Sequence, residues 1–480
     1  MFIPYIIDSF RGGVSDEDSK GIEGSFKLGK TLDIHKRRDS LTCQQAMATV
    51  GSGTVDGLVN FFVKGTDDSL YGFSSNGDIY SIAGDHDDPV VGTRYVDANG
   101  AIKGADLWGL DDDSYYFFWA TDTSVSRKQM STSNSGMDWG NASLNWKTTL
   151  SSTDWHAMKK ACGKLLIANL DYLAGVDFDG GYNASLFNIE PGNTMKCLES
   201  RGDYVIIGSS SESHDEEGMI WAWISTATNY INKKKIPVSG VNALIDTEFT
   251  LLQGGTDGEI FLSDFTDTEP LAAVPLEGYC DPGGVTIVND LALFNIYGGT
   301  HNGLWSYGRR NRNRGVALNF EYRFAVEVAG STISHAGGVG TINGTVYAAW
   351  KTIDGSTTSY GVDQVSDTTK VTSTFEGLEF DGGSPHLNKT FRDVHLIMAP
   401  LPASTSVAVK VKLDKDSSWT DLYTPSGSTT FTQTDATEAV FLLSGKSRIL
   451  EMGVTLTPTA NLTPEVLAIV TYVEEETTEY

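Results

Sequence analysis

A pair of apolar runs joined by a short turn rich in glycine and aspartate recurs seven times between about residues 55 and 365. In the clearest copy, the apolar run 291–294 precedes Gly298 and Gly299, and a second run, 304–307, follows. Glycine and aspartate accept positive φ angles at little steric cost, so this arrangement indicates a β-hairpin. The leading runs of the seven copies begin at residues 61, 115, 165, 204, 249, 291 and 346.

The spacing of these hairpins predicts the fold. Successive leading runs begin 54, 50, 39, 45, 42 and 55 residues apart. A period of about 40–50 residues that contains only strands is typical of a β-propeller, with one four-stranded blade in each repeat. We therefore expect an all-β chain whose residues 53–370 form a seven-bladed propeller.

The two ends of the chain lack this repeat. Residues 1–52 are predicted to be an arm with short strands near 25–28 and 32–35, which either completes the last blade and closes the ring or reaches a neighbouring subunit. Residues 371–480 contain alternating apolar runs, which predict a separate C-terminal β-sandwich. These runs are 394–398, 406–413, 439–443, 452–456 and 466–473.

Charge and cysteine usage exclude several classes of protein. The chain has 62 acidic and 35 basic side chains and a net charge of −27, which argues against nucleic acid or an anionic membrane as the principal partner. Its four cysteines are far apart without a CxxC pair, so we expect buried free thiols. Residues 1–7 lack the features of a signal peptide, and no apolar run reaches the roughly 20 residues of a membrane helix. We expect synthesis in a cytoplasm and no membrane partner.

No motif in the chain indicates catalysis. GxSxG, P-loop and GxGxxG sequences are absent, and among 62 acidic residues any candidate carboxylate pair is uninformative. Residues 132–139 resemble the Asp-box hairpin of sialidase-type propellers, but that box is a folding element and occurs once here. Residues 111–113 and 177–180 could bind calcium, although solvated turns are the favoured interpretation. We therefore expect no enzyme activity, no cofactor and no metal ion.

Basic residues form one dense cluster inside the predicted ring, at residues 309–314. Four guanidinium groups so close together repel one another unless an anion is near. They could face carboxylates of a neighbouring copy, carboxylates of another protein or phosphates in a channel, or form a solvated loop. Together with part of the arm, this cluster is our candidate interface of a homo-oligomeric ring. Its residues are Phe10, Arg11, Lys36, Arg37, Arg38, Arg309, Arg310, Arg312 and Arg314.

Segments near both ends resemble bacteriophage proteins. Residues 10–15 (Phe-Arg-Gly-Gly-Val-Ser), followed by 21–26 and 32–34, resemble the start of structural proteins of tailed phages. Residues 377–383 (Gly-Leu-Glu-Phe-Asp-Gly-Gly) and 414–420 are similar to domains that follow propellers in phage tail proteins. The family includes the tail nozzle of short-tailed phages, in which several copies form a ring through which DNA passes.

This resemblance implies a structural virion protein that is made in the host cytoplasm, forms a homo-oligomeric ring and binds other tail proteins. It also implies proximity to packaged DNA. A charge of −27 would suit a channel through which DNA slides without sticking, or an outward-facing subunit that never meets DNA. Two alternatives remain open: a propeller that binds a receptor or glycan without catalysis, and a glycosidase- or sialidase-like enzyme.

Overall fold

The computed structural model describes residues 2–15, 17, 23–35, 40–50, 55–82, 91–111, 113–130, 139–211, 217–247, 250–255, 258–264, 268–272, 278–309 and 316–475. The chain divides into two compact units. Unit 1 comprises Met1–Met47, Leu304–Arg323 and Ser366–Tyr480, and unit 2 comprises Ala48–Gly303 and Phe324–Val365. Helix in the described residues is limited to α1 (Ala325–Val328) and one 3-10 turn, Trp139–Asn141. The prediction of an all-β chain is therefore confirmed.

Unit 2 contains seven antiparallel sheets in chain order, here called the first to the seventh sheet. The first is β7 (Val59–Lys64), β8 (Leu70–Ser74), β9 (Asp78–Ile82) and β10 (Val91–Val96); the second is β11 (Gly104–Gly109), β12 (Tyr115–Ala120), β13 (Val125–Gln129) and β14 (Ser143–Lys147). The third is β15 (Met158–Ala161), β16 (Lys164–Asn169), β17 (Tyr172–Val176) and β18 (Tyr182–Asn188); the fourth is β19 (Asn193–Arg201), β20 (Tyr204–Ser211), β21 (Gly218–Trp223) and β22 (Asn232–Ile236).

The remaining sheets continue the same order. The fifth is β23 (Val241–Asp246), β24 (Thr250–Gly254), β25 (Glu259–Ser263) and β26 (Thr268–Ala272). The sixth begins with β27 (Val285–Val288) and β28 (Leu291–Ile296). The seventh is β31 (Ile333–Ile342), β32 (Thr345–Asp354) and β33 (Thr357–Lys370), with β6 (Gln45–Thr49) as its outermost strand.

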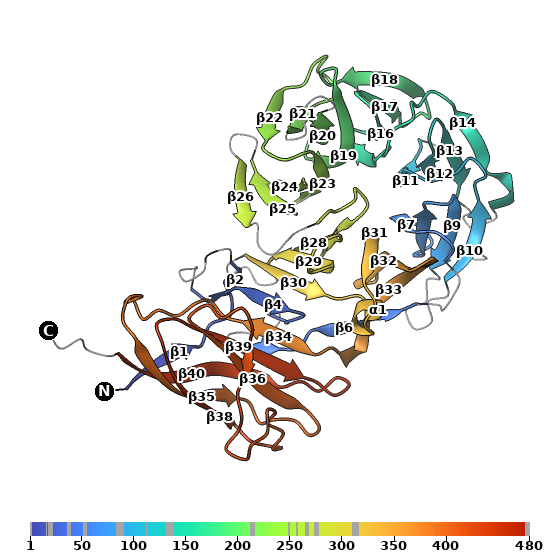
Figure 1. Cartoon of the computed structure of the whole chain (residues 1–480). Coiled ribbons are helices and arrows are strands. Elements are labelled where there is room, and N and C mark those ends of the chain that lie inside the picture. The colour runs from blue at the N-terminus through green and yellow to red at the C-terminus, as the bar shows by residue number, and fades with distance from the viewer. Residues whose placement is uncertain are drawn as a thin grey trace. The chain divides into compact units, whose positions relative to one another are not determined.

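The first strands of the seven sheets form a closed ring. β7 packs against β11, β11 against β15, and the series continues through β19, β23, β27 and β31 until β31 returns to β7. Figure 1 shows the sheets arranged around one centre. Radial sheets whose first strands surround a common axis define a β-propeller, and seven of them confirm the predicted seven-bladed ring.

Each of the seven predicted leading runs lies in a different sheet, but the first run is not the equivalent strand of its sheet. The run at 61–63 lies in β7, the first strand of its sheet, whereas the other six lie in the second strands β12, β16, β20, β24, β28 and β32. Its predicted return run, 78–80, is β9, and β8 pairs between the two. This shift of one strand accounts for part of the irregular spacing.

The sheets pack face to face through aromatic and aliphatic side chains. Between the first and second sheets, Phe73, Phe117 and Trp119 are buried together, while Trp221 and Trp223 fill the layer between the third and fourth. Close approach also requires glycine at Gly104 in β11, because a Cβ there would overlap the carbonyl of His156. Burial on both faces explains why these strands read as continuous apolar runs.

A buried carboxylate organises the seventh sheet. The side chain of Asp363 in β33 accepts hydrogen bonds from Thr49 Oγ1 at 2.8 Å, Trp350 Nε1 at 2.8 Å and the Ala325 backbone N–H at 2.6 Å. The Val50 N–H donates to the Val362 carbonyl at 2.8 Å, beside the same residue. Asp363 therefore connects the end of the N-terminal arm, β32 and the start of α1.

Unit 1 contains two main sheets, which form the predicted β-sandwich. The first has the order β1 (Ile3–Ile7), β40 (Glu465–Glu475), β35 (Lys389–Met398) and β38 (Glu438–Ser447), and β5 (Leu41–Thr42) also pairs with β40. Within unit 1, the second has the order β29 (Gly303–Gly308), β30 (Ala317–Tyr322), β4 (Leu28–Lys30), β34 (Ser373–Glu376), β39 (Leu450–Thr457), β36 (Ser406–Leu413) and β37 (Thr420–Asp421). The five predicted alternating runs are strands β35, β36, β38, β39 and β40.

The N-terminal arm supplies strands to this sandwich. β1 pairs antiparallel with β40, and β4 pairs with β34. Phe10 and Phe26 are buried with their rings edge-on to Phe375, at 5.4 and 5.6 Å between centroids. The short strands β2 (Gly13–Val14) and β3 (Ser25–Phe26) pair with each other in parallel. The compact unit therefore includes both ends of the chain, unlike the predicted separate domain 371–480.

Candidate functional site

The ring encloses a cavity on its axis. Its volume is about 270 Å³, and its lining comes from the first strands or adjoining residues of all seven sheets, including Phe61, Asp106, Lys159, Glu199, Leu244, Val285 and Val339. A concave site with a few polar groups is the usual place for a small ligand. The charged side chains in its lining are Lys64, Asp106, Lys159, Lys160 and Glu199.

Ion pairs link neighbouring sheets around this cavity. Successive side chains of a strand point to opposite sides, so the adjacent lysines of β15 reach different neighbours. Lys160 Nζ lies 3.5 Å from Asp106 Oδ1 on β11, and Lys159 Nζ lies 2.8 Å from Glu199 Oε1 on β19. Arg201 Nε on β19 lies 3.7 Å from Asp246 Oδ1 on β23. The pairs join the second, third, fourth and fifth sheets.

The carboxylates Asp106 and Glu199 are held by hydrogen bonds and basic partners. Burial raises the pKa of Asp106 and of Glu199, whereas the nearby lysines act to lower it. Glu199 also accepts a hydrogen bond from the Ser200 N–H at 2.8 Å. Each carboxylate therefore has a basic partner on a neighbouring sheet.

A tyrosine, a histidine and a carboxylate meet beside the sixth sheet. The Tyr297 hydroxyl donates to Asp281 Oδ1 at 3.1 Å, His335 Nε2 lies 2.7 Å from Asp281 Oδ2, and the rings of Tyr297 and His335 stack at 3.9 Å. Burial, followed by the charge of Asp281, raises the pKa of Tyr297. A phenol held in its protonated form differs from the activated tyrosine of sialidase chemistry.

Unit 1 contains a serine, a histidine and a glutamate in contact, but they do not form a catalytic triad. Ser306 Oγ lies 3.1 Å from His35 Nε2 and donates to Glu321 Oε2 at 2.9 Å. In a triad the carboxylate binds the opposite nitrogen of the imidazole, whereas Glu321 lies 3.8 Å from this same Nε2. Ser306 and Glu321 are fully buried, so no substrate reaches them.

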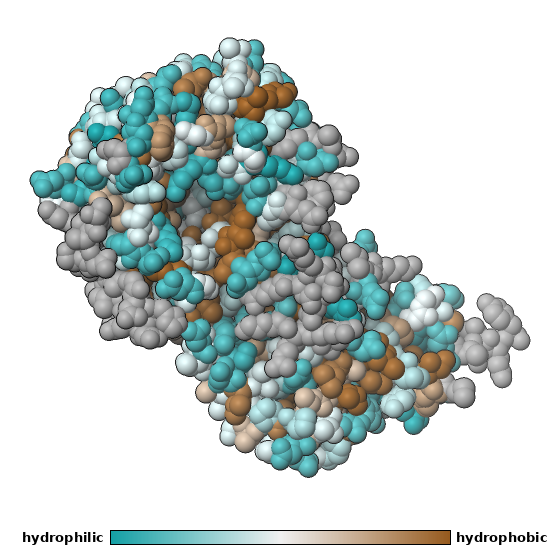
Figure 2. Space-filling model, turned by 180° about the vertical axis from the view of Figure 1, so that it is seen from behind, coloured by the Kyte–Doolittle hydropathy of each residue, from teal (hydrophilic) through white to brown (hydrophobic). Residues whose placement is uncertain are grey.

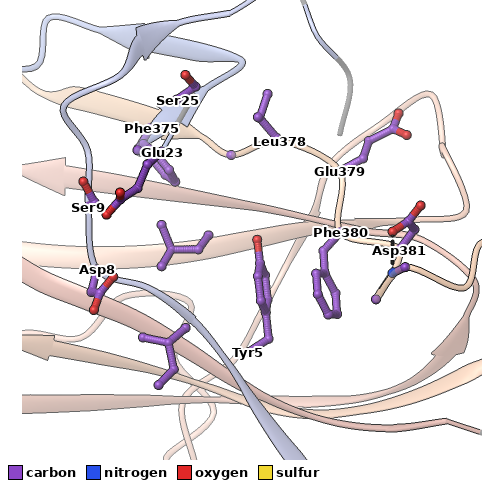
Figure 3. A pocket seen from close by; sticks show the side chains of 16 residues that line it. Tyr5, Asp8, Ser9, Glu23, Ser25, Phe375, Leu378, Glu379, Phe380 and Asp381 are labelled. Carbon is purple, nitrogen blue, oxygen red and sulfur yellow. Dashed lines mark hydrogen bonds between the residues drawn. The ribbon is translucent and has the colours of Figure 1, made fainter. Parts of the chain in front are cut away.

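A second cavity lies within unit 1, between the N-terminal arm and the segment after β34 (Figure 3). Its volume is about 360 Å³. Tyr5 lies at its centre with the ring stacked on Phe380, and four carboxylates line it: Asp8, Glu23, Glu379 and Asp381. Two of these already have partners, because Glu379 lies 3.2 Å from Lys415 Nζ and Asp381 accepts from the Gly383 N–H at 2.8 Å.

Three of the nine predicted interface residues lie in the described part of the chain, and six lie outside it. Phe10 is buried, with 2% of its surface exposed, and is therefore part of the core of unit 1 rather than an exposed contact. Arg11 and Arg309 are half-buried. The other six lie outside the described residues, and their role stays a prediction: Lys36, Arg37, Arg38, Arg310, Arg312 and Arg314.

The other candidate site residues predicted from the sequence make ordinary turn and ion-pair contacts wherever the structure describes them. Asp177 pairs with Lys164, and Asp179 accepts from the Gly181 N–H at 2.9 Å, as expected for a turn. No group of three His, Cys, Asp or Glu side chains suited to a metal ion occurs in the described ranges. All four cysteines are free; Cys162 is half-buried and the other three are buried. Of the Asp-box-like stretch 132–139, residues 132–138 lie outside the described part of the chain.

The architecture defines a seven-bladed β-propeller protein with an added β-sandwich. No family model and no curated protein matches the sequence. Among solved structures, the WD40 propeller domain of Doa1 aligns with 14% identity and a TM-score of 0.44, over 67% of this chain and 96% of that one. The Neurospora crassa Pan2 WD40 domain aligns with 10% identity and a TM-score of 0.44, over 67% of this chain and 96% of that domain.

A third similar structure is the extracellular domain of a one-component system from B. thetaiotaomicron, with 12% identity and a TM-score of 0.45. The alignment covers 75% of this chain and 44% of that domain. Since all three TM-scores are below 0.5, the fold assignment rests on the closed ring of sheets itself. In the described residues, no helix has the length and apolar character needed to cross a membrane.

Proposed function

We propose that this chain is a non-catalytic structural subunit of a tailed-phage virion that assembles with other tail proteins. One observation carries the proposal: parts of two segments that resemble phage proteins, although far apart in sequence, line the same cavity of unit 1. Glu23, Gly24 and Ser25 line it from the N-terminal arm, and the segment 377–383 lines it from the other side. Parts of the segments 21–26 and 377–383 are therefore neighbours in unit 1.

One backbone pair joins the segments 10–15 and 21–26, and a second contact lies just outside 21–26 and 377–383. Gly13 pairs with Ser25, and the Lys27 N–H donates to the Glu376 carbonyl at 2.9 Å. A Cβ at Gly13, whose φ is +74°, would overlap the Leu318 carbonyl, so this position of the Arg-Gly-Gly motif requires glycine. The motif thus supports packing rather than chemistry, which suits a structural protein.

The edge of β1 offers a way to dock another tail protein. Among the described strands, β1 pairs with β40 alone, so one row of its backbone N–H and C=O groups lacks a strand partner. An extended segment can add to such an edge as a further strand. Asp8 and Glu23 beside this edge favour a segment that carries lysine or arginine.

Purified virions test the proposal. Particles of the phage that encodes this sequence should contain the chain in a fixed copy number by mass spectrometry, and deletion of the gene should give particles with incomplete tails. Exchange of Asp8 and Glu23 for lysine should reduce incorporation, whereas Asp354→Lys on the β32–β33 hairpin should not. Complete, infectious particles without the chain would contradict the proposal.

A second candidate function is glycan binding by the same cavity. An aromatic ring among carboxylates and hydroxyls is a common arrangement for a sugar, whose hydroxyl groups donate to carboxylates while its apolar face covers the ring. Here Tyr5, Ser9 and Ser25 accompany the four carboxylates. Binding to a glycan array that is lost on Tyr5→Ala would favour this function, and no binding by the intact chain would exclude it.

A further inference from the structure

The outer face of the sheet β1–β40–β35–β38 carries exposed apolar side chains together with a few charged ones. Residues directly opposite one another in an antiparallel pair share a face of the sheet. The strand registers place Ile6, Val470, His395 and Val440 in one row across all four strands. The alternate residues, including Leu396, are buried in the sandwich, so this row points to solvent.

Large apolar side chains extend the row. Ile6 is 50% exposed, Ile397 38%, Leu442 49% and Tyr472 39%. Tyr423 forms a bridge with Leu442 and is 54% exposed, so it widens the same face beyond β38. Figure 2 shows apolar side chains gathered on the part of the surface near the C-terminal end. We call the outward side of the four strands β1, β40, β35 and β38, together with Tyr423, the β38 face.

The β38 face is large enough to be an interaction site. Four strands spaced about 4.8 Å apart, each with roughly eight residues that rise about 3.3 Å, cover about 500 Å². The largest apolar patch of a typical monomer is about 300–600 Å² and is often an interaction site. The whole face, charged side chains included, therefore has the size of patches that often bind a partner.

The charges on the β38 face balance. Arg392 and Lys446 stand on it with Glu438 and Glu474, and Glu438 Oε1 lies 2.7 Å from His395 Nδ1. Arg392 also lies over the ring of Phe2, at 4.2 Å from the centroid. Asp393, at the bulge of β35, accepts from the Leu443 N–H at 3.2 Å. The face is nearly neutral, although the chain carries a net charge of −27.

We infer that the β38 face binds the β38 face of a second copy of this chain. A basic partner would be attracted by the carboxylates that cover most of the acidic surface. The nearly neutral β38 face would not attract such a partner. A second copy carries the same charge of −27 and is repelled by those carboxylates, so a neutral apolar face is where it can approach. A two-fold contact between identical patches is self-complementary, and two sheets pack face to face at about 10 Å.

Sedimentation of the full chain tests this inference. The wild type should reach a mass near twice the 51.9 kDa of one chain as its concentration rises from about 1 to about 100 μM. Raising NaCl from about 0.05 to about 0.5 M should strengthen association, because salt screens the repulsion between acidic copies. The double substitution Ile397→Glu and Leu442→Glu should raise the dissociation constant at least about tenfold, which is about 1.4 kcal/mol.

A matched variant separates this contact from general effects of an added charge. Ile353 on β32 is 52% exposed but lies in the ring, so Ile353→Glu should associate like the wild type. Equal thermal transitions of all variants would show that each is folded. A wild type that stays monomeric at high salt would overturn the inference. So would a double variant that associates like the wild type, or equal losses in both variants.

Discussion

The ring of Tyr5 lies flat against the ring of Phe380, with 3.7 Å between centroids and 16° between planes. Tyr5 belongs to β1 near the start of the chain, and Phe380 follows β34 near its end. Phe380 also contacts Phe391 of β35 at 6.4 Å, edge-on. Through this contact the first strand of the chain becomes part of the core of unit 1.

Loss of this stack should destabilise unit 1. Tyr5→Ala removes a large aromatic side chain and leaves a cavity, but the site is only partly buried, so we expect a loss of about 2–3 kcal/mol. Tyr204→Ala in the ring, where the side chain is 44% exposed, should cost less than about 1 kcal/mol. Urea unfolding of the two variants provides the comparison, and equal losses would contradict the role assigned to the stack.

The ionisation of Tyr5 should make unit 1 sensitive to alkaline pH. Burial raises the pKa of Tyr5 to about 12, above the ordinary tyrosine value of about 10. The unfolded chain therefore releases this proton at lower pH than the folded chain. The stabilisation is complete below about pH 10 and is lost as pH rises towards about 12. Tyr5→Phe should remove this part of the pH dependence in urea unfolding, and an unchanged profile would exclude it.

The fragment 371–480 should not fold alone. It lacks β1, β4 and β5, which pair with β40 and β34 in the intact chain. Phe375 would also lose its contacts with Phe10 and Phe26. We expect aggregation and no cooperative thermal transition by circular dichroism, in contrast to the full chain. A sharp transition of the isolated fragment would support the separable domain expected from sequence.

The buried carboxylate of Glu321 should be essential to unit 1. It accepts hydrogen bonds from Gln44 Nε2 at 2.5 Å, Ser306 Oγ at 2.9 Å and Asn319 Nδ2 at 2.9 Å. Glu321→Leu leaves these donors without their acceptor, at a cost of about 3–5 kcal/mol. Glu438→Gln, which changes an exposed carboxylate, should cost less than about 1 kcal/mol in the same urea experiment. Similar stability of both variants would refute this assignment.

The ion pair of Lys159 and Glu199 should stabilise the ring. Lys159→Met leaves a buried carboxylate without its ammonium partner; because Lys159 is partly exposed, we expect a loss of about 1–3 kcal/mol at neutral pH. Adding Glu199→Gln to Lys159→Met should restore part of the lost free energy of unfolding.

The deficit of Lys159→Met should also shrink in acid. Burial raises the pKa of Glu199, and loss of Lys159 raises it further. A carboxyl group with a raised pKa in the folded state favours folding as pH falls. Urea unfolding between about pH 7 and about pH 5 measures this trend, and a deficit that grows in acid would contradict it.

The arginines of the 309–314 cluster should act in assembly if they meet carboxylates of a neighbour. Charge reversal at Arg310 and Arg312 is then expected to weaken assembly while leaving the thermal transition nearly unchanged. An ionic contact weakens as salt rises, whereas the β38 face should bind more tightly. Sedimentation in low and high salt therefore distinguishes the two contacts. Normal entry of the reversed protein into particles would indicate a solvated loop.

Local sequence signals determined the repeated part of the fold. Strands such as β16 and β28 are buried on both faces, so they read as short apolar runs, and glycine- and aspartate-rich turns separate them. The five longer strands of the sandwich alternate apolar and polar residues because one face of each is buried. Both signals depend on neighbouring residues only, which is why the all-β class, the seven repeats and the sandwich could be predicted.

Only the tertiary structure decided where the N-terminal arm pairs and which side chains meet. β1 has five residues and β3 has two, so their pairing depends on distant partners rather than on their own sequence. The contacts of Tyr5 with Phe380 and of Gln44 with Glu321 join residues hundreds of positions apart. No local pattern encodes such contacts, because they are selected by the packing free energy of the whole unit.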